Sequence, residues 1–445
     1  MIKGKVKMEK NLQLYLHIPF CIQKCDYCDF LSFPMEEGAR EKWLQREGLG
    51  EQSAVVSVNE EGRKQYIDAL INEIKSNKEK YESYKISTIF MGGGTPSILL
   101  SEEILAIFTA LEESFEVDKE AEITIEVNPG TVTEDKIVAW KRVGINRISI
   151  GLQSANDKEL KLLGRIHTFH QFKETFSLLR EHGFSNINVD LISGVPGQTV
   201  ESYMKTLNRV IELNPEHISA YGLMIEEGTK LGGIYIEREE NVGKKYIANE
   251  KEDEKRCFFE RLQPYVVRDS YPDLPNEEIE RQMYKITKER LKQYGYHQYE
   301  MTNYSKKGFE CKHNIGYWER ENYLGMGLGA ASLIGNVRFS QVRGLDRYIE
   351  EFSFEKGLQP KEPKDRVILD EKEQMEEFMF LGLRKTKGIS KTKFKENFDK
   401  NIDQVYGGIL VNMEKESLIE INDDEIRLTE KGIDVSNYVL AEFIF

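Results

Sequence analysis

The chain of 445 residues is poor in cysteine, proline and tryptophan, and it has no long apolar run. It contains 5 Cys, 11 Pro and 3 Trp, and five cysteines in a chain of this length are too few for a disulfide framework. Because no run of about 18 apolar residues occurs, no membrane-spanning helix is expected. The apolar stretch after the lysine-rich residues 1–10 is too short and interrupted for a signal peptide. The sequence therefore predicts a cytoplasmic protein, with peripheral contact to a membrane left open.

Basic residues are also fewer than acidic ones. The chain has 62 Lys and Arg against 76 Asp and Glu, which gives a formal net charge of -14. Such an acidic chain is a poor candidate for general nucleic-acid binding, because phosphates attract basic surfaces. The hydrophobic share of 40% and the charged share of 31% are normal for a soluble protein, and the length suits more than one domain.

Three of the few cysteines are gathered near the N-terminus. Cys21, Cys25 and Cys28 form a C-x3-C-x2-C loop, which follows an apolar strand expected over Leu12–Ile18 and ended by Pro19. Three thiolates can ligate three irons of a [4Fe–4S] cluster, and the fourth iron then stays open for a substrate's amino and carboxylate groups. Zinc usually takes a fourth Cys or His, and a disulfide fits neither three cysteines nor an intracellular protein. Both alternatives are therefore weaker.

Strands and helices alternate over the first half of the chain. Short apolar runs predict strands at residues 86–91, 123–127, 147–150, 187–192 and 217–221, with helices between them. Together with the strand before the cysteine loop, this makes six strand–helix units, which indicates a parallel sheet with helices outside. The predicted fold class is α/β, as an incomplete (β/α)6 barrel; a doubly wound sheet is the alternative.

The sequence divides into three predicted domains. Residues 1–230 are expected to form the barrel, with an inserted loop at about 35–62 that is rich in Glu, Gly and Ser. Residues 231–371 form an elaborated connecting region that carries an H-N-x-x-Y-W motif. Residues 372–445 contain three predicted helices and a hairpin, which together resemble a winged-helix-like α+β domain.

Polar residues and glycines follow the predicted strands. The turn Gly92–Pro96 comes directly after a strand, and its glycines let a ligand approach exposed N–H groups. Glu126 and Asp190 lie at strand ends, Gln153 just beyond one, and Arg165 in the loop after the next helix. Alone, each would be read as a solvated or structural residue. Because the carboxyl ends of parallel strands share one edge of a sheet, these residues are expected to converge on one ligand site.

The motifs, taken in order, resemble the HemN/HemW group of radical S-adenosylmethionine (SAM) proteins. They read LHIPFC, GGGTPS, EVNPGT, RISIGLQS, LGRIH and GVPGQT, and the resemblance covers nearly the whole chain. The group contains oxygen-independent coproporphyrinogen III oxidases and HemW-type heme chaperones. The resemblance implies that Cys21, Cys25 and Cys28 ligate a [4Fe–4S] cluster. The SAM contacts that it implies are Tyr15, Tyr27, Gly93, Gly94, Thr95, Glu126, Gln153, Arg165, Asp190 and Ala220.

Two departures and one match favour the chaperone branch of this group. The dehydrogenase branch has a further cysteine where this chain has Phe30, and it starts with a longer extension. The segment His313-Asn314-x-x-Tyr317-Trp318 matches the motif tied to heme binding in the chaperone branch. An imidazole can ligate heme iron, and Tyr and Trp can pack on a porphyrin; a structural histidine is the alternative. The next histidine candidates are His17, His167, His217 and His297.

The sequence thus predicts a radical SAM heme chaperone, which binds heme and transfers it to hemoproteins. The implied cofactors are one [4Fe–4S] cluster, SAM and heme. The alternative is an oxygen-independent coproporphyrinogen III dehydrogenase, which oxidatively decarboxylates propionate side chains, so no catalytic residue is assigned. A nucleic-acid-binding regulator built on the winged helix is disfavoured by the charge. The expected partners are heme, recipient hemoproteins and an electron donor for the cluster, without nucleic acid and with a homodimer left open.

Overall fold

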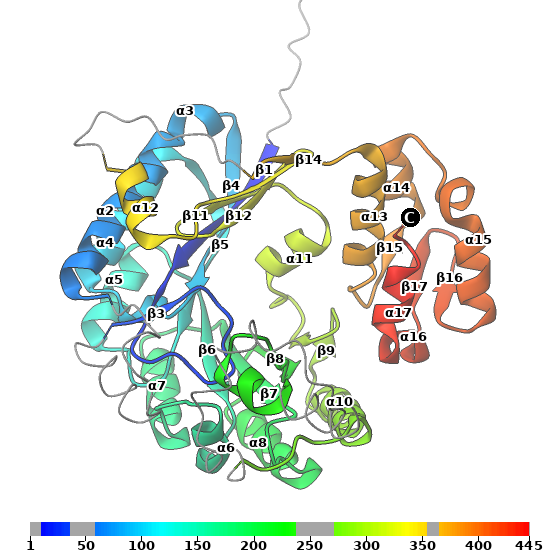
Figure 1. The fold of residues 1–445 in the computed structure, drawn as a ribbon, viewed down its shortest axis with the longest axis horizontal. Coiled ribbons are helices and arrows are strands. Elements are labelled where there is room, and N and C mark those ends of the chain that lie inside the picture. The colour runs from blue at the N-terminus through cyan, green and yellow to red at the C-terminus, as the bar shows by residue number, and fades with distance from the viewer. Residues whose placement is uncertain (1–9, 36–57, 237–270, 354–364, 445) are drawn as a thin grey trace, which may run out of the picture.

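A large open sheet forms the centre of the protein (Figure 1). The computed structural model describes residues 10–35, 58–236, 271–353 and 365–444. The six strands at the centre of the sheet are parallel and neighbour one another in chain order. They are β1 (Lys10–Ile18), β4 (Tyr84–Gly93), β5 (Glu116–Val127), β6 (Arg147–Gln153), β7 (Ile187–Ser193) and β8 (His217–Gly222). The predicted incomplete (β/α)6 barrel is confirmed.

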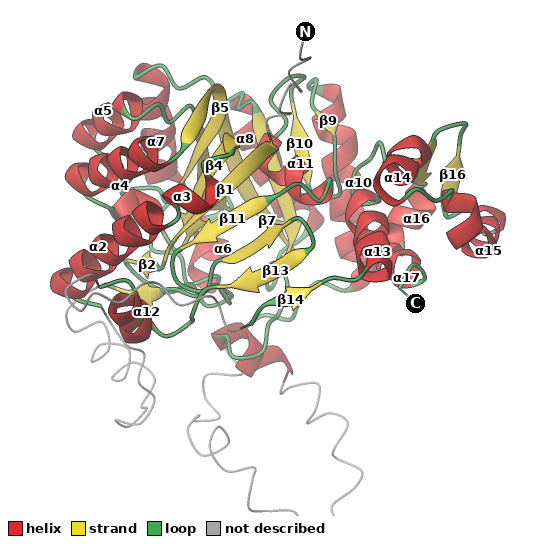
Figure 2. Cartoon of the chain, turned by 90° about the horizontal axis from the view of Figure 1, so that it is seen from above, coloured by secondary structure: helices red, strands yellow, loops and turns green. Residues whose placement is uncertain are grey.

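Helices cover the outer face of this sheet, as Figure 2 shows. They are α2 (Glu60–Ser76), α3 (Lys78–Tyr81), α4 (Ser101–Ser114), α5 (Glu134–Arg142), α6 (Asp157–Leu162), α7 (Phe169–Glu181) and α8 (Val200–Glu212). Side chains alternate between the two faces of each strand. In β6, for example, Ile148, Ile150 and Leu152 are fully buried in the apolar layer under the helices. The residues between them face the inside of the barrel, where the predicted site lies.

The connecting region extends the same sheet at both edges. Next to β1 lie β11 (Tyr323–Met326), β12 (Ala331–Ile334), β13 (Val337–Ser340) and β14 (Val367–Ile368), and next to β8 lie β10 (Asn303–Ser305) and β9 (His297–Gln298). Only β11 joins in parallel, and the others are antiparallel. Helices α10 (Glu277–Gln293), α11 (Lys312–Trp318) and α12 (Leu345–Glu351) complete the region. The division into three domains stays a prediction, and segments on both sides of residue 230 share this sheet.

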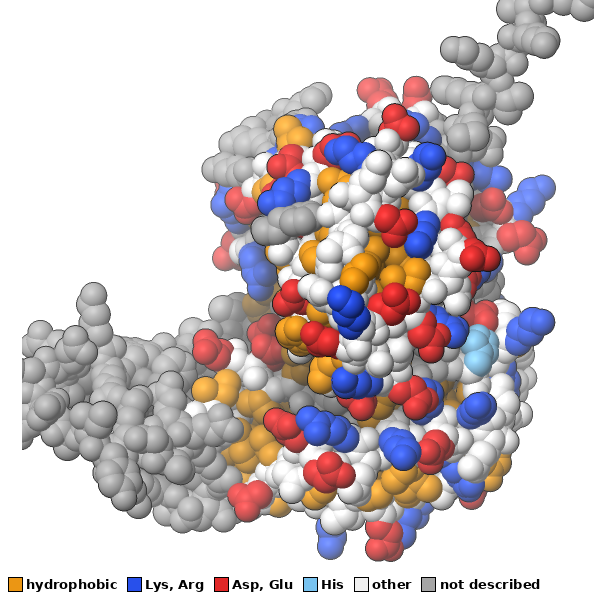
Figure 3. All heavy atoms as spheres, turned by 90° about the vertical axis from the view of Figure 1, so that its right-hand side faces the viewer, with side chains coloured by type: hydrophobic (Ala, Val, Ile, Leu, Met, Phe, Trp, Pro, Cys, Tyr) orange, Lys and Arg blue, Asp and Glu red, His pale blue; other side chains and the backbone are white. Residues whose placement is uncertain are grey.

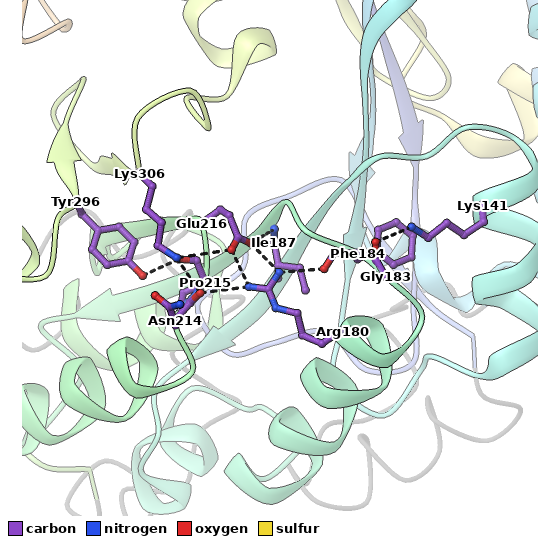
Figure 4. Close-up of polar contacts among 10 residues, drawn as sticks. All are labelled: Lys141, Arg180, Gly183, Phe184, Ile187, Asn214, Pro215, Glu216, Tyr296 and Lys306. Carbon is purple, nitrogen blue, oxygen red and sulfur yellow. Dashed lines mark hydrogen bonds and ion pairs between the residues drawn. The ribbon is translucent and has the colours of Figure 1, made fainter.

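A polar network ties the connecting region to the barrel (Figure 4). Glu216 accepts a hydrogen bond from the Ile187 amide (3.1 Å) and pairs with Arg180, whose Nη1 lies 2.8 Å from its carboxylate. Lys306 donates to the carbonyl of Asn214 (3.0 Å), and the Tyr296 hydroxyl donates to the carbonyl of Pro215 (2.6 Å). The turn before β8 is therefore fixed from both sides, by α7 and by the residues that flank the β9–β10 pair.

The C-terminal part forms a compact unit with its own core. It contains α13 (Glu371–Gly382), β15 (Ile389–Ser390), α14 (Lys391–Phe398), α15 (Ile402–Lys415), β16 (Ile419–Ile421), β17 (Glu425–Leu428), α16 (Glu430–Asp434) and α17 (Ser436–Ala441). Met379, Phe394 and Tyr406 are buried in this core. The predicted three helices and hairpin are present. The sequence pattern missed the two short helices after the hairpin, because each has only one or two turns.

Acidic and basic side chains mix over the face of this unit that Figure 3 shows. Three of the lysines within residues 384–395 pair with carboxylates: Lys387 with Glu425, Lys391 with Asp403, and Lys393 with Glu319. Part of the basic charge of this segment is therefore compensated locally. That no nucleic acid binds stays a prediction.

The inserted loop predicted at about 35–62 ends earlier than expected. Asn59 caps α2 by accepting a hydrogen bond from the Gly62 amide (2.9 Å), so residues 60–62 are helical. Residues 36–57 and 237–270 lie outside the described residues, and Cys257 lies among them. Within the described part of the chain, no helix is long and apolar enough to cross a membrane.

Candidate functional site

The inside of the barrel is lined by polar side chains from every central strand. Because side chains alternate, the inward positions recur every second residue. They include Gln13, Tyr15 and His17 on β1; Thr88 and Phe90 on β4; Glu122, Thr124 and Glu126 on β5; Arg147, Ser149 and Gln153 on β6; Asn188 and Asp190 on β7; and His217 and Ser219 on β8. The carboxyl ends of the strands and the cysteine loop meet at one end of this polar interior.

The three cysteines of the loop lie together at this end. Cys21 is buried in β2 (Phe20–Cys21), which pairs with β3 (Phe33–Pro34), and Cys25 and Cys28 are half-buried. Burial, together with a smaller contribution from the neighbouring Cys25, raises the pKa of Cys28 to about 11. Thiols that hinder each other's ionisation in this way favour a bound cation. Among the residues described, no three His, Cys, Asp or Glu side chains converge on a single metal ion; in a [4Fe–4S] cluster, each cysteine binds a different iron.

The glycine turn lies directly against the cysteine loop. Gly94 and Thr95 donate backbone hydrogen bonds to the carbonyls of Ile18 (2.8 Å) and Phe20 (2.7 Å), and Thr95 Oγ1 lies 3.5 Å from Cys21 Sγ. A Cβ atom on Gly94 would lie 2.6 Å from the Phe20 carbonyl oxygen, so only glycine fits. These contacts therefore fix the position of the glycine turn relative to the cysteine loop.

Arg165 connects the cysteine loop to β5 and β6. Its Nη1 lies 3.5 Å from Cys25 Sγ, and its Nη2 donates to Asn128 Oδ1 and to the Gly151 carbonyl, both at 2.7 Å. Asn128 in turn donates to Thr95 Oγ1 (2.7 Å). Asn128 is not among the residues that the sequence pattern predicts for the site, although its place directly after a strand, in EVNPGT, was the available signal.

Two half-buried carboxylates face this end of the barrel. Glu126 accepts a hydrogen bond from the Gly93 amide (3.1 Å), and Asp190 accepts from Asn188 (2.7 Å) and Ser149 (3.1 Å). Burial raises the pKa of Glu126 to about 7, with a further contribution from Asp190, and burial also raises the pKa of Asp190. A ligand that carries positive charge and hydroxyl donors would relieve this repulsion.

The remaining predicted SAM residues lie around these groups. Gln153 is the last residue of β6 and not beyond it, and its φ of 71° is in the left-handed region. Asp190 lies in the middle of β7 and not at its end. Tyr27 packs among the apolar Leu163, Ile192 and Val195, and the amide of Ala220 donates to the carbonyl of Thr302 (2.8 Å).

A pocket opens beside the cluster loop. It is lined by Ile22, Gln23, Cys25, Thr95, Asn128, Pro129, Thr131, Gly164, Arg165, Ile166 and His167. Three of the predicted cluster and SAM residues, Cys25, Thr95 and Arg165, thus share one opening. The structure thus brings Cys25, Thr95 and Arg165 together beside the cluster loop. Which residues contact SAM stays a prediction.

The H-N-x-x-Y-W motif lies at the opposite end of the barrel, on helix α11. His313 is buried, with its Nδ1 2.7 Å from Thr88 Oγ1 and its Nε2 3.0 Å from Tyr317 Oη. Burial lowers its pKa to about 3, with a smaller contribution from Arg147. Trp318 lies on the far side of the helix, under the guanidinium of Arg384 (4.6 Å). Asn314 is half-buried on the first turn. Both imidazole nitrogens of His313 therefore already have hydrogen-bond partners in the protein, Thr88 and Tyr317.

An aromatic column joins the two ends of the barrel. The ring of Phe90 stacks on His313 (centroids 5.1 Å apart) and on Tyr15 (6.4 Å). The Tyr15 hydroxyl lies 3.0 Å from His17 Nδ1, and His17 Nε2 lies 2.8 Å from the carbonyl oxygen of Leu31 in the cluster loop. Because a carbonyl can only accept, Nε2 carries the proton and Nδ1 accepts from Tyr15. The column thus runs from the motif helix to the cluster loop.

Glu122 holds the start of helix α11. Its carboxylate accepts from the amides of Lys312 and His313, both at 3.1 Å, and from Cys311 Sγ at 3.5 Å. We expect Glu122→Ala to lower the free energy of unfolding by about 3 kcal/mol, because buried donors then lose a charged acceptor. Chemical denaturation measures this loss. The exposed Glu120→Ala on the same strand is the matched control, and an equal change in both variants would contradict the role of Glu122.

The other histidines differ in how far they are engaged. Both ring nitrogens of His17 and of His217 are hydrogen-bonded, His217 to Asn188 (2.6 Å) and to Tyr299 (2.8 Å). His167 Nε2 lies 3.2 Å from the Leu152 carbonyl oxygen, and His297 Nε2 lies 2.8 Å from Glu310. Like His313, the buried His17 and His217 would have to give up existing bonds before either could ligate iron.

Known proteins match the chain over almost its full length. The profile of the radical SAM superfamily matches residues 15–210, and that of the HemN C-terminal domain matches residues 369–435. The heme chaperones HemW of Lactococcus lactis and Bacillus subtilis are each 31% identical, over 98% and 97% of this chain and 98% of their own lengths. Among solved structures, coproporphyrinogen III oxidase (HemN) of Escherichia coli, a radical SAM enzyme, aligns with a TM-score of 0.74 and 23% identity, covering 98% of this chain and 90% of that chain.

The fold and the cysteine site define a radical SAM protein with a HemN-type C-terminal domain. Within this superfamily, the chain belongs to the HemW family. Membership in the superfamily implies a [4Fe–4S] cluster and SAM. The convergent thiols suit the cluster, the half-buried carboxylates of Glu126 and Asp190 suit a cationic group of a ligand, and the guanidinium of Arg165 suits a carboxylate.

Proposed function

We propose that this protein is a heme chaperone, which binds heme and transfers it to recipient hemoproteins. The observation that carries the proposal is the 31% identity to the HemW heme chaperones over nearly their full length. Phe30 adds support, since it occupies the position of the further cysteine of the dehydrogenase branch, and 67% of its side chain is exposed beside the cluster loop.

In this proposal, Cys21, Cys25 and Cys28 hold the cluster, and SAM binds across the carboxyl ends of the strands. When bound, the cluster supplies an open iron for the amino and carboxylate groups of SAM and a source of electrons. The half-buried carboxylates of Glu126 and Asp190 accept from the cationic and hydroxyl groups of the ligand. Gln153 and the further predicted SAM contacts complete the binding site. An electron donor is then a required partner.

The anaerobically reconstituted protein should bind ferric heme near one to one and should not convert coproporphyrinogen III. The motif segment His313-Asn314-x-x-Tyr317-Trp318 is the heme site that the sequence predicts, so this hypothesis expects weaker binding in His313→Ala. Titration by Soret absorbance measures heme, and chromatography of the porphyrins measures turnover with SAM and a reductant. Clear formation of protoporphyrinogen would restore the dehydrogenase alternative.

A further inference from the structure

A chain of hydrogen bonds runs through the barrel from Asp190 to the start of helix α11. Asn188 Nδ2 donates to Asp190 Oδ1 (2.7 Å), and Asn188 Oδ1 lies 2.6 Å from His217 Nδ1. His217 Nε2 lies 2.8 Å from the hydroxyl of Tyr299, and this hydroxyl lies 3.3 Å from the backbone nitrogen of Cys311. Cys311 is the N-cap residue of α11. We call these five residues the Asp190–Cys311 chain.

The hydrogen bonds of the Asp190–Cys311 chain all point the same way. A carboxylate only accepts, so the Asn188 atom that faces Asp190 is the amide nitrogen, and Asn188 Oδ1 accepts from His217 Nδ1. Burial holds the pKa of His217 well below its usual range. The imidazole is therefore neutral, and its Nε2 accepts from the Tyr299 hydroxyl. The Tyr299 oxygen in turn accepts from the Cys311 amide, so each group fixes the orientation of the next.

The three middle residues of the chain are shielded from water. Asn188 is 2%, His217 is 0% and Tyr299 is 9% exposed. Ser219 also donates to Asn188 Oδ1 (3.1 Å), which holds this amide in the same orientation. Because a buried polar group that loses its partner is costly, a change in one of these residues alters the next one along the chain.

Tyr299 is the residue at which the chain meets other parts of the protein. Its amide donates to the carbonyl of Asn303 on β10 (3.2 Å), and its carbonyl accepts from the amide of Thr386, which follows α13 (3.0 Å). Its hydroxyl accepts from the amide of Cys311. The position of Tyr299 therefore depends on the edge of the sheet, on the C-terminal unit and on helix α11.

The carboxylate at the other end of the chain is held at both oxygens. Asn188 donates to Oδ1 of Asp190, and Ser149 donates to Oδ2 (3.1 Å). These bonds set the plane of the carboxylate and leave its remaining lone pairs for a ligand. We infer that Asn188, His217 and Tyr299 are positioning residues for SAM, which orient Asp190 and couple SAM binding to the start of helix α11.

The inference rests on the proposed function, in which Asp190 contacts SAM, and it is tested by calorimetry with SAM on the full, anaerobically reconstituted chain. Tyr299→Phe removes only the hydroxyl at the far end of the chain, and it should weaken SAM binding by about threefold to tenfold. Added to Asp190→Ala, the same change should have no further effect, because the carboxylate that the chain orients is absent.

Tyr203→Phe is the matched control. Tyr203 is also buried, and its hydroxyl lies 2.8 Å from Thr287 Oγ1, between helices α8 and α10 on the outer side of the sheet. This variant loses one buried hydrogen bond of the same kind outside the chain. Its SAM affinity should equal that of the wild type, and its iron content should equal that of Tyr299→Phe.

Hydrogen exchange of residues 311–318 measures the far end of the chain. Because coupling between two sites is reciprocal, SAM should slow exchange at the start of α11 in the wild type and should not do so in Tyr299→Phe. Exchange that is indifferent to SAM in the wild type would overturn the coupling.

Three results of the calorimetry would overturn the positioning role. They are wild-type SAM affinity in Tyr299→Phe, an equal loss of affinity in Tyr203→Phe, and an effect of Tyr299→Phe that persists in full in the Asp190→Ala background. Unchanged SAM affinity in Asp190→Ala itself would instead overturn the SAM site of the proposed function.

Discussion

Replacing Cys25 with alanine should remove the iron–sulfur cluster from the protein. The three cysteines are the only thiols that the loop offers, so the loss of one leaves an iron without a protein ligand. After anaerobic reconstitution, we expect the brown chromophore and most of the iron to be absent. Iron analysis and the visible spectrum measure this directly, independently of any activity.

Cys311→Ala is the control for this experiment. Cys311 is buried at the start of α11, at the far end of the barrel, where it contacts Glu122. Its removal should leave four irons bound. Retention of four irons in Cys25→Ala would mean that the cluster is held elsewhere.

Removing Asp190 or Arg165 should weaken SAM binding by about tenfold to hundredfold. Each supplies a charged partner, and losing one costs roughly 1.5–3 kcal/mol. Calorimetry with SAM on Asp190→Ala and Arg165→Ala tests this expectation. Because Arg165 also contacts Cys25, the iron content of its variant must be measured in the same preparation.

Arg142→Ala is the matched control for the loss of a guanidinium. Arg142 is exposed at the end of α5, away from the strand ends. SAM affinity should be unchanged in this variant. If Asp190→Ala and Arg165→Ala both bound SAM like the wild type, the proposed SAM site would be wrong.

The central strands could be predicted because their sequence signal is local. Each has an apolar run of sufficient length, and polar motifs follow it at the edge where ligands bind. The outer strands carry no such signal. Strand β11 has four residues, one of them Gly325, and its pairing depends on β1, which lies far away in sequence. A short segment of this kind is indistinguishable from a turn until its partner is known.

The site shows the same limit. The motifs identified Glu126 and Arg165, but Asn128 was not selected, because its role depends on contacts to Thr95 and Arg165. The environment of His313 was also beyond prediction. Its nitrogens are bonded to Thr88 and Tyr317, and Thr88 comes from a strand early in the chain. The sequence shows which polar groups are present, whereas the fold determines which of them are already hydrogen-bonded within the protein.

The pairing of β1 with β11 has a consequence for how the protein is made. Strand β1 is synthesised long before its neighbour β11, because Gln13 pairs with Tyr323, which lies far later in the chain. Until then, one edge of β1 is without its neighbour, and such an edge invites pairing with other chains. Contacts so distant in sequence also slow folding. Fragments that end near residue 230 should therefore aggregate on expression, and the nascent chain should depend on folding assistance until the second half is complete.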